Sequence, residues 1–279
     1  MKIAWIGAGK MGLPICKRLK AAGHDVRILA RRQEQAEFLR TLGFAIESTI
    51  PALVRDVDIV FTAVSDDKAL ADVVLNNRLA APFFIDMSTV SPEVSSKVAA
   101  HLDKNTAYLR APVSGSTALA EAGTLTALVS GPKAAFDAMA GIFAAFTKKT
   151  FHVGEAEEAR YLKLAINSMV CASAALLGEA LAFGVKGGLT LQTMMDVINQ
   201  SVVASPLIGY KTNMIVSGNY EAAASLNTLM KDLDLFLSAA GRQNMSFPVN
   251  SEIMETYRAA SEKGLGDKDF FVLVQQAAP

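Results

Sequence analysis

The chain has 279 residues, enough for two domains, and 51% of them are hydrophobic, so a large core is expected and extensive disorder is excluded. Lys and Arg total 27, as do Asp and Glu, which gives no electrostatic attraction to nucleic acid or an anionic membrane. Cys16 and Cys171 are too few for a disulfide framework or a cysteine metal site, and the three histidines lack ligand spacing. We therefore expect no metal and a reducing, cytoplasmic location.

Up to about residue 150 the chain alternates short apolar strands with helices. Gly23 and Gly43 close two of the helices, and Ser91-Pro92 opens another as its cap and first turn. This pattern predicts an α/β fold in which residues 1–154 form a Rossmann-type, doubly wound parallel sheet. The expected strands are Ile3–Ile6, Val26–Ala30, Phe44–Ile46, Asp58–Val64, Phe83–Met87, Tyr108–Ala111 and Thr126–Ser130, and the other expected helices are Leu13–Ala22, Gln33–Leu42 and Lys68–Leu75.

From residue 155 to residue 279 we predict an all-helical second domain. A long helix, Ala159–Val185, is apolar nearly all round, so it should be buried on most sides and join the two domains. Its most apolar stretch, Leu164–Leu177, is too short and too polar to span a bilayer, so no membrane is expected. Exposed apolar faces seldom stay bare, which favours a homodimer or homotetramer. The helices that follow are expected at Leu191–Ser201, Leu226–Gly241 and Val249–Lys263.

A glycine motif follows the first strand. Gly7, Gly9 and Gly12 have the spacing G-x-G-x-x-G between a strand and a helix. The first glycine allows a tight turn, the second lets a pyrophosphate approach the backbone, and the third lets the helix pack on the strand. The helix N-terminus presents unpaired N–H groups and a positive dipole end to phosphates. The loop, including Lys10 and Met11, is therefore predicted to bind a dinucleotide; the alternative is a glycine-rich turn without a ligand.

The residues after the second strand indicate which dinucleotide binds. An acidic residue there, about 20 residues beyond the glycines, bonds the free 2′-hydroxyl of NAD. This chain instead has Arg31 and Arg32. The planar donor fork of an arginine pairs well with a phosphate. We therefore predict NADP rather than NAD, with Arg31 as the main contact to the 2′-phosphate and Arg32 assisting; the alternative is a solvated surface pair.

Three further segments place polar side chains where ligands bind in such folds. The segments 86–89 (D-M-S-T) and 111–116 (A-P-V-S-G-S) follow strands, at the ligand edge of the sheet, although each is also compatible with an ordinary loop. Lys163 and Asn167 are four residues apart, on one face at the start of the long helix. A lysine there either extends its ammonium group to water or is held for chemistry.

Together these motifs resemble the β-hydroxyacid dehydrogenase family, which includes 3-hydroxyisobutyrate dehydrogenases, tartronate semialdehyde reductases and glyoxylate/succinic semialdehyde reductases. The resemblance covers nearly the whole chain and is specific because several motifs occur in order: I-G-A-G-K-M-G-L-P-I, A-G-H-D-V, D-M-S-T-V-S-P, A-P-V-S-G, A-G-T-L-T, K-L-A-I-N and M-K-D-L. It implies an oxidoreductase that transfers a hydride between nicotinamide and a small aldehyde or keto acid, or the corresponding β-hydroxy acid.

The resemblance also implies residue roles. Lys163 matches the family's catalytic lysine, and Asn167 matches its substrate-orienting asparagine. Hydride transfer leaves a developing alkoxide, which a cationic lysine stabilises and protonates, and burial beside a dinucleotide would bring the lysine pKa toward the working pH. The substrate-carboxylate loop corresponds to Ser114 and Gly115, with Ser116 next to it, and the remaining contacts to cofactor or substrate correspond to Val64, Ser65, Thr89 and Lys231.

Three residues depart from the family's usual pattern and bear on the substrate more than on the reaction. Arg110 stands where an aspartate usually precedes A-P-V-S-G, Ser116 replaces a glycine, and Ala224 stands at a usually aromatic position. Two other interpretations stay open. An imine reductase of related fold commonly has Asp or Tyr at the position of Lys163. A dinucleotide-binding protein without turnover would use Lys163 and Asn167 structurally.

Overall fold

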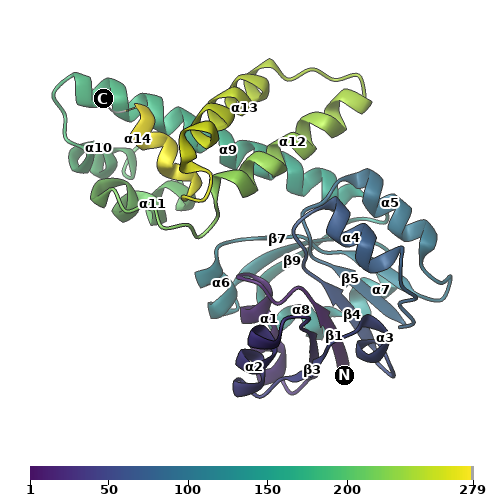
Figure 1. Ribbon diagram of the computed structural model, residues 1–279. Coiled ribbons are helices and arrows are strands. Elements are labelled where there is room, and N and C mark those ends of the chain that lie inside the picture. The colour runs from purple at the N-terminus through teal and green to yellow at the C-terminus, as the bar shows by residue number, and fades with distance from the viewer. Residues whose placement is uncertain (278–279) are drawn as a thin grey trace. The chain divides into compact units, whose positions relative to one another are not determined.

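The computed structural model describes residues 1–277, which divide into two compact units. The first is Met1–Lys163, and the second begins at Leu164. The strands belong to the first unit, whereas helices α10–α14 belong to the second (Figure 1). The division falls inside helix α9 (Glu158–Lys186), whereas the sequence analysis places the domain boundary between residues 154 and 155.

The first unit alternates strands and helices, as the sequence pattern predicts. Ser91 caps its helix as expected, since its Oγ accepts a hydrogen bond from the Val94 N–H at 3.1 Å. The elements are β1 (Lys2–Ile6), α1 (Gly12–Ala21), β2 (Asp25–Leu29), α2 (Gln33–Thr41), β3 (Ala45–Glu47), α3 (Ile50–Leu53), β4 (Ile59–Thr62), α4 (Asp67–Val74), β5 (Phe83–Asp86), α5 (Pro92–His101), β6 (Ala107–Arg110), β7 (Val113–Ser114), α6 (Thr117–Ala122), β8 (Leu125–Ser130), α7 (Lys133–Ala138), α8 (Ala140–Ala144) and β9 (Thr147–Gly154).

These strands form one sheet in the order β3-β2-β1-β4-β5-β6-β8-β7, with β9 paired to β8. The pairs from β3 to β6 are all parallel, which confirms the doubly wound Rossmann-type fold. The expectation of a wholly parallel sheet is wrong at one edge, because β8 runs antiparallel to β6 and β7. The chain returns from β7 to β8 through the short connection 115–124, whereas a parallel crossover needs a dozen residues or more.

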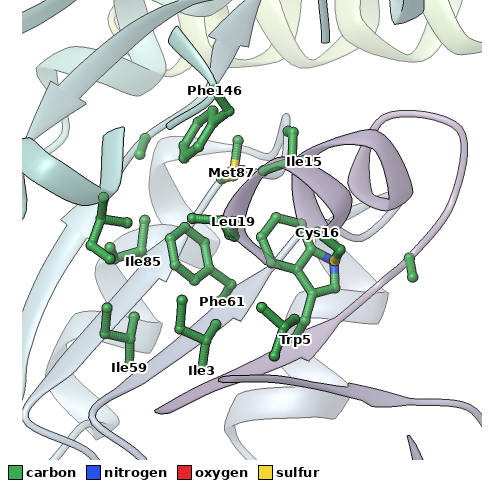
Figure 2. Packing of buried hydrophobic residues seen from close by; sticks show 14 of the residues in the cluster. Ile3, Trp5, Ile15, Cys16, Leu19, Ile59, Phe61, Ile85, Met87 and Phe146 are labelled. Carbon is green, nitrogen blue, oxygen red and sulfur yellow. The ribbon is translucent and has the colours of Figure 1, made fainter. Parts of the chain in front are cut away.

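Helices cover both faces of this sheet, because successive strand side chains point to opposite sides. Ile3 and Trp5 pack against Ile15 and Leu19 of α1, and the Trp5 ring stacks on Phe61 with ring centroids 4.9 Å apart (Figure 2). The intervening residues of β1 join a second cluster with α3, α4 and α5. The carboxyl ends of β1 and β4 adjoin at the point where the strand order reverses, which is where ligands bind in such sheets.

The second unit consists of helices around its own core, as expected. Pro206–Ser217 is a helix that the sequence analysis does not predict, although Ser205 caps it in the same way that Ser91 caps α5. The interior Gly209 and several β-branched residues weaken the helical signal there. The helices beyond α9 are α10 (Leu191–Ile198), α11 (Pro206–Ser217), α12 (Leu226–Arg242), α13 (Pro248–Ala260), the π-helical turn η1 (Ser261–Leu265), the 3-10 turn η2 (Phe270–Val272) and α14 (Leu273–Ala277).

Helix α9 has 29 residues and is long and apolar enough to cross a bilayer by length and composition alone. However, 44% of its most apolar window is buried within the protein. Cys171, Ala174, Leu177 and Leu181 from this helix belong to the core of the second unit. One side of α9 thus packs in a core, whereas Met169, Leu176 and Phe183 are exposed, so the expectation that the helix is buried on most sides is met only in part.

Candidate dinucleotide and catalytic site

The predicted cofactor contacts of the first unit follow the carboxyl ends of adjacent strands. The glycine loop follows β1, Arg31 and Arg32 follow β2, Val64 and Ser65 follow β4, and Thr89 follows β5. Since β2, β1, β4 and β5 are neighbours in parallel order, these segments share one edge of the sheet. The structure therefore brings together residues that are up to 82 positions apart in the sequence, from Gly7 to Thr89.

The three glycines of the loop are constrained in different ways. Gly7 has φ +99°, and a Cβ there would lie 2.2 Å from the carbonyl oxygen of Ala63. A Cβ on Gly12 would lie 2.3 Å from the carbonyl oxygen of Gly7. A Cβ on Gly9 would meet no atom of residues 1–277 within 4 Å beyond its own chain neighbours. The fold itself thus explains the first and third glycines, whereas the open space at Gly9 fits the close approach of a pyrophosphate.

The start of α1 fits the same ligand. Met11 precedes the helix and supplies no side-chain cap, and no acidic residue lies in the first turn. The positive dipole end of the helix favours an anion, although the Leu13 N–H already donates to the Gly9 carbonyl oxygen at 3.0 Å and Pro14 has no N–H. Lys10 is exposed beside this turn. Arg31 and Arg32 are also exposed, and within residues 1–277 neither forms an ion pair.

A buried network connects two of these loops with the start of α9. Asp86, at the end of β5, forms an ion pair with Arg160, and the two side chains are 0% and 1% exposed. The Asp86 Oδ1 accepts hydrogen bonds from the Thr62 and Ser88 hydroxyls, each at 2.6 Å. Burial alone would lower the pKa of Arg160, but the charge of Asp86 raises it, so the guanidinium stays protonated. No sequence motif points to Arg160.

Arg110, one of the departures from the family pattern, belongs to a second buried ion pair. Its Nη2 lies 2.5 Å from the Glu157 Oε1, and its guanidinium lies 4.0 Å from the ring centre of Tyr108. The two ion-paired side chains are 7% and 13% exposed. Arg110 therefore connects the end of β6 with the residue that precedes α9. The Arg110 guanidinium is thus already paired with a carboxylate of this chain, that of Glu157.

The predicted substrate-carboxylate loop lies at β7 and α6. Ser114 ends β7 and is half-buried. Gly115 has φ +140°, and a Cβ there would lie 2.7 Å from Leu125 Cδ2, so the fold itself requires glycine. The Ser116 Oγ accepts a hydrogen bond from the Leu119 N–H at 3.4 Å and caps α6. Ser116, which replaces the family's usual glycine, thus has a local structural role as a helix cap.

Two further predicted residues meet in the second unit. The Asn167 Nδ2 donates a hydrogen bond to the Asp232 Oδ2 at 2.6 Å, and the Lys231 Nζ lies 2.7 Å from the Asp232 Oδ1. Asn167 and Asp232 are buried, whereas the Lys231 side chain is 29% exposed. Asp232 fixes the orientation of the Asn167 amide, because a carboxylate only accepts hydrogen bonds. Asp232 lies within the M-K-D-L motif, but the motif alone predicts no role for it.

Lys163 lies in the second turn of α9, one turn before Asn167, and is half-buried. Ala224 is half-buried against the core of the second unit, before α12. Among residues 1–277, no group of three or more His, Cys, Asp or Glu side chains is placed to hold a metal ion.

Comparison with known families divides the chain near the start of α9. Residues 2–154 match the family model of the NAD-binding domain of 6-phosphogluconate dehydrogenase. Residues 158–277 match the family model described as the NAD-binding domain of NADP-dependent 3-hydroxyisobutyrate dehydrogenase.

Curated relatives include proteins of two kinds. The cytokine-like nuclear factor N-PAC of Anopheles gambiae is 29% identical over 276 residues, which are 96% of this chain and 49% of that protein. The chain thus spans about half the length of the N-PAC relatives that it matches. The 2-(hydroxymethyl)glutarate dehydrogenase of Eubacterium barkeri is 29% identical over 283 residues, covering 99% of this chain and 94% of that enzyme.

Solved structures agree in fold. The Mycobacterium tuberculosis 3-hydroxyisobutyrate dehydrogenase, solved with L-serine, has a TM-score of 0.88 and 25% identity, covering 99% of this chain and 98% of that chain. The protein Psf3, in complex with NADP+ and 2-OPP, has a TM-score of 0.87 and 26% identity, covering 99% and 100%. An imine reductase from Pseudomonas sp. has a TM-score of 0.66 and 19% identity, covering 99% and 98%, and shares the fold alone.

The two family models together account for nearly the whole described chain, in the order that the sequence motifs predict. The glycine loop, its uncapped helix and the neighbouring strand ends have the geometry that such a domain uses for a dinucleotide. The chain belongs to the β-hydroxyacid dehydrogenase family, and its first unit is an NAD(P)-binding domain.

Proposed function

We propose that this protein is an NADP-dependent oxidoreductase that interconverts a small aldehyde or keto acid and the corresponding β-hydroxy acid, with Lys163 as the general acid and base. The observation that carries the proposal is the tie between the start of α9 and the loop after β5: Arg160, one turn before Lys163, bonds Asp86 and Ser88 beside Thr89. Related proteins with dehydrogenase or reductase in their names support the same reaction class.

The chain's own residues would divide the work as follows. The glycine loop and the N-terminus of α1 would bind the pyrophosphate, and Val64, Ser65 and Thr89 would contact the rest of the cofactor. The bound nicotinamide supplies or accepts the hydride. Lys163 would donate its proton to the developing alkoxide, and in the reverse direction it would accept the proton of the alcohol. Ser114 and Gly115 would bind the substrate carboxylate, and Asn167 and Lys231, both held by Asp232, would orient the substrate.

Replacement of Lys163 tests the reaction. We expect Lys163→Ala to keep NADPH binding and to lose about 10²- to 10⁴-fold in kcat, the usual contribution of a general acid or base. Lys186→Ala, at the exposed far end of the same helix, is the control and should turn over normally. Turnover is followed by nicotinamide absorbance with a panel of small aldehydes, keto acids, hydroxy acids and cyclic imines. Binding is followed by energy transfer from Trp5, the chain's single tryptophan, to NADPH.

The outcomes separate this proposal from its rivals. Full activity in Lys163→Ala would remove the lysine from the mechanism, and activity on cyclic imines alone would favour the imine reductases, whose fold this chain shares. The second candidate is a dinucleotide-binding protein without turnover, and the N-PAC relatives, whose names give nuclear factors and no enzyme activity, are compatible with it. That second candidate predicts tight NADPH binding and no turnover of any compound in the panel by the unmodified protein.

The preference for NADP rests on the exposed pair Arg31 and Arg32 at the end of β2. We expect Arg31→Asp to weaken NADP by roughly 10- to 100-fold, because a charge-assisted hydrogen bond contributes about 1.5–3 kcal/mol, and to change NAD affinity little. Arg40→Asp, an equal charge change at the other end of α2, is the control. Titrations in which Arg31→Asp loses equal affinity for both cofactors would contradict the assignment.

We also propose that the protein forms a homodimer or homotetramer. Met169, Leu176 and Phe183 lie seven residues apart on α9, and their side chains are 70%, 60% and 85% exposed. A seven-residue apolar repeat aligns on one face of a helix and suits packing against another helix at a shallow angle. A second copy of the chain offers the same stripe, which makes a two-fold contact self-complementary.

A further inference from the structure

We propose that Arg160 is a positioning residue for Lys163: its guanidinium fixes the first turns of α9 to the loops that carry the cofactor contacts. The idea rests on the proposed function, because it concerns the placement of the proposed general acid. Arg160 is a buried cation, and the proposed function does not place it in contact with substrate or cofactor.

The guanidinium of Arg160 makes four different contacts. Its Nη1 donates to the Ser88 carbonyl oxygen at 2.6 Å, and its Nη2 bonds the Asp86 carboxylate and, at 3.0 Å, the Tyr108 hydroxyl. Its Nε donates to the Ser95 hydroxyl at 3.2 Å. These partners come from β5, β6, α5 and the loop after β5. A planar group held on so many sides is fixed in rotation as well as in position.

The same network extends to the turn after β4. The Ser88 hydroxyl donates to Asp86 and accepts a hydrogen bond from the Val64 N–H at 2.9 Å. Val64 is one of the predicted cofactor contacts, and Ser88 directly precedes another, Thr89. One continuous set of hydrogen bonds therefore joins Arg160 with both loops.

The helix transmits this anchoring to Lys163. Residues three apart are neighbours on a helix surface, and both Arg160 and Lys163 lie in the first two turns of α9. Because an α-helix is stiff over one turn, a shift or rotation at Arg160 moves the lysine relative to the loops after β4 and β5. A displacement of about 1 Å in a reacting group costs about 10²-fold in rate.

The second buried ion pair provides a matched control. Arg110 and Glu157 also join a strand end to the start of α9 and are also nearly buried. Within residues 1–277 their side-chain hydrogen bonds run to each other and do not reach Ser88 or Val64, although Arg110 also lies over the Tyr108 ring. The double variants Asp86→Asn/Arg160→Gln and Arg110→Gln/Glu157→Gln each neutralise one pair without leaving a lone buried charge. Both variants remove a nearly buried ion pair, and they differ in the number of hydrogen bonds lost and in the connection to the cofactor loops.

The experiment measures where Lys163 sits as well as how fast the enzyme turns over. Lys163 acetylation is quantified by mass spectrometry with and without saturating NADP+, alongside kcat, the pH profile of kcat/KM and NADP+ affinity from Trp5 fluorescence. In the unmodified protein we expect NADP+ to slow acetylation of Lys163. In Asp86→Asn/Arg160→Gln we expect that protection to be lost, the lysine limb of the pH profile to move, and kcat to fall about 10²-fold. The Arg110→Gln/Glu157→Gln variant should behave like the unmodified protein.

Three results would overturn the idea. If NADP+ fails to protect Lys163 even in the unmodified protein, the proposed function and this inference both fall. If protection and the pH profile are unchanged in Asp86→Asn/Arg160→Gln, the inference falls and the proposed function stands. If both double variants lose activity equally, the ion pairs act only through stability. Should Asp86→Asn/Arg160→Gln not fold, Arg160→Lys takes its place, since one ammonium group cannot reproduce the four contacts and should show the same loss of protection.

Discussion

At the scale of single residues, the glycine loop contains glycines that the fold requires and one that only a ligand would require. Gly7 and Gly12 are enforced by the carbonyl oxygens of Ala63 and Gly7. Gly9 faces open space, so no contact within the described part of the chain explains why it lacks a side chain. A bound pyrophosphate explains it, because the phosphate must approach the backbone closely.

Two alanine variants test this division. We expect Gly12→Ala to destabilise the first unit by about 1–3 kcal/mol, because its methyl group overpacks a buried contact. Gly9→Ala should leave the unfolding midpoint unchanged and weaken dinucleotide binding at least tenfold. Thermal unfolding and Trp5 energy transfer give the two quantities. Unchanged affinity in Gly9→Ala would argue against the glycine loop as the phosphate site.

The sequence identifies residues whose task depends on local spacing and misses those that depend on distant partners. Gly12 and the Ser91 cap follow from the sequence because residues within a few positions determine them, and Gly7 is recognised by its motif spacing although the carbonyl oxygen that it approaches belongs to Ala63. Arg160 and Asp232 escape notice, since their partners Asp86 and Asn167 are 74 and 65 positions away. Only the folded sheet and helix bundle bring such pairs together.

At the scale of elements, the apolar stripe on α9 carries a prediction. Leu176→Glu should leave the isolated chain folded, because the side chain is already 60% exposed. It should dissociate an oligomer that buries this stripe. Light scattering across a concentration series measures the mass, with Lys186→Glu on the same helix as the control. A monomeric unmodified protein would remove the basis for the prediction.

The bounds of the predicted strands and helices agree best with the structure where particular residues mark their ends. Strands and helices bounded by glycine or by a Ser-Pro pair are found within a residue or two. Strand β9 is missed because its first half, T-K-K-T, is polar and lies at the edge of the sheet, where apolar alternation is weak. The antiparallel direction of β8 is not predicted, because the direction of a strand depends on how the chain connects it to its neighbours in the sheet.

At the scale of the whole molecule, the two units have separate hydrophobic cores. NADP+ at a hundred times its Kd adds about 2.7 kcal/mol to whatever it binds in folded form. We expect this stabilisation in the first unit, as slower amide hydrogen exchange in β1, β4 and β5. Amides of α12 and α13 should change little. Equal slowing throughout the chain would contradict independent responses of the two units.

The fold class, the order of the two parts and the family follow from the sequence alone, because composition and motif order are properties of the whole chain. The composition changes after Gly154, whereas the compact units divide at Lys163 and Leu164, inside a continuous helix. Residues just before the division are helical in sequence pattern yet packed against the sheet through Arg160 and Glu157.

The two cysteines give each unit its own internal probe of opening. Cys16 lies in α1 of the first unit and Cys171 in α9 within the second, and both are buried and outside any disulfide of the described residues. Burial raises the pKa of Cys16 well above its ordinary value, so little reactive thiolate forms while α1 stays packed. A thiol reagent therefore modifies each cysteine only when the unit that contains it opens. The modification rates of the two cysteines therefore report the opening of the two units separately.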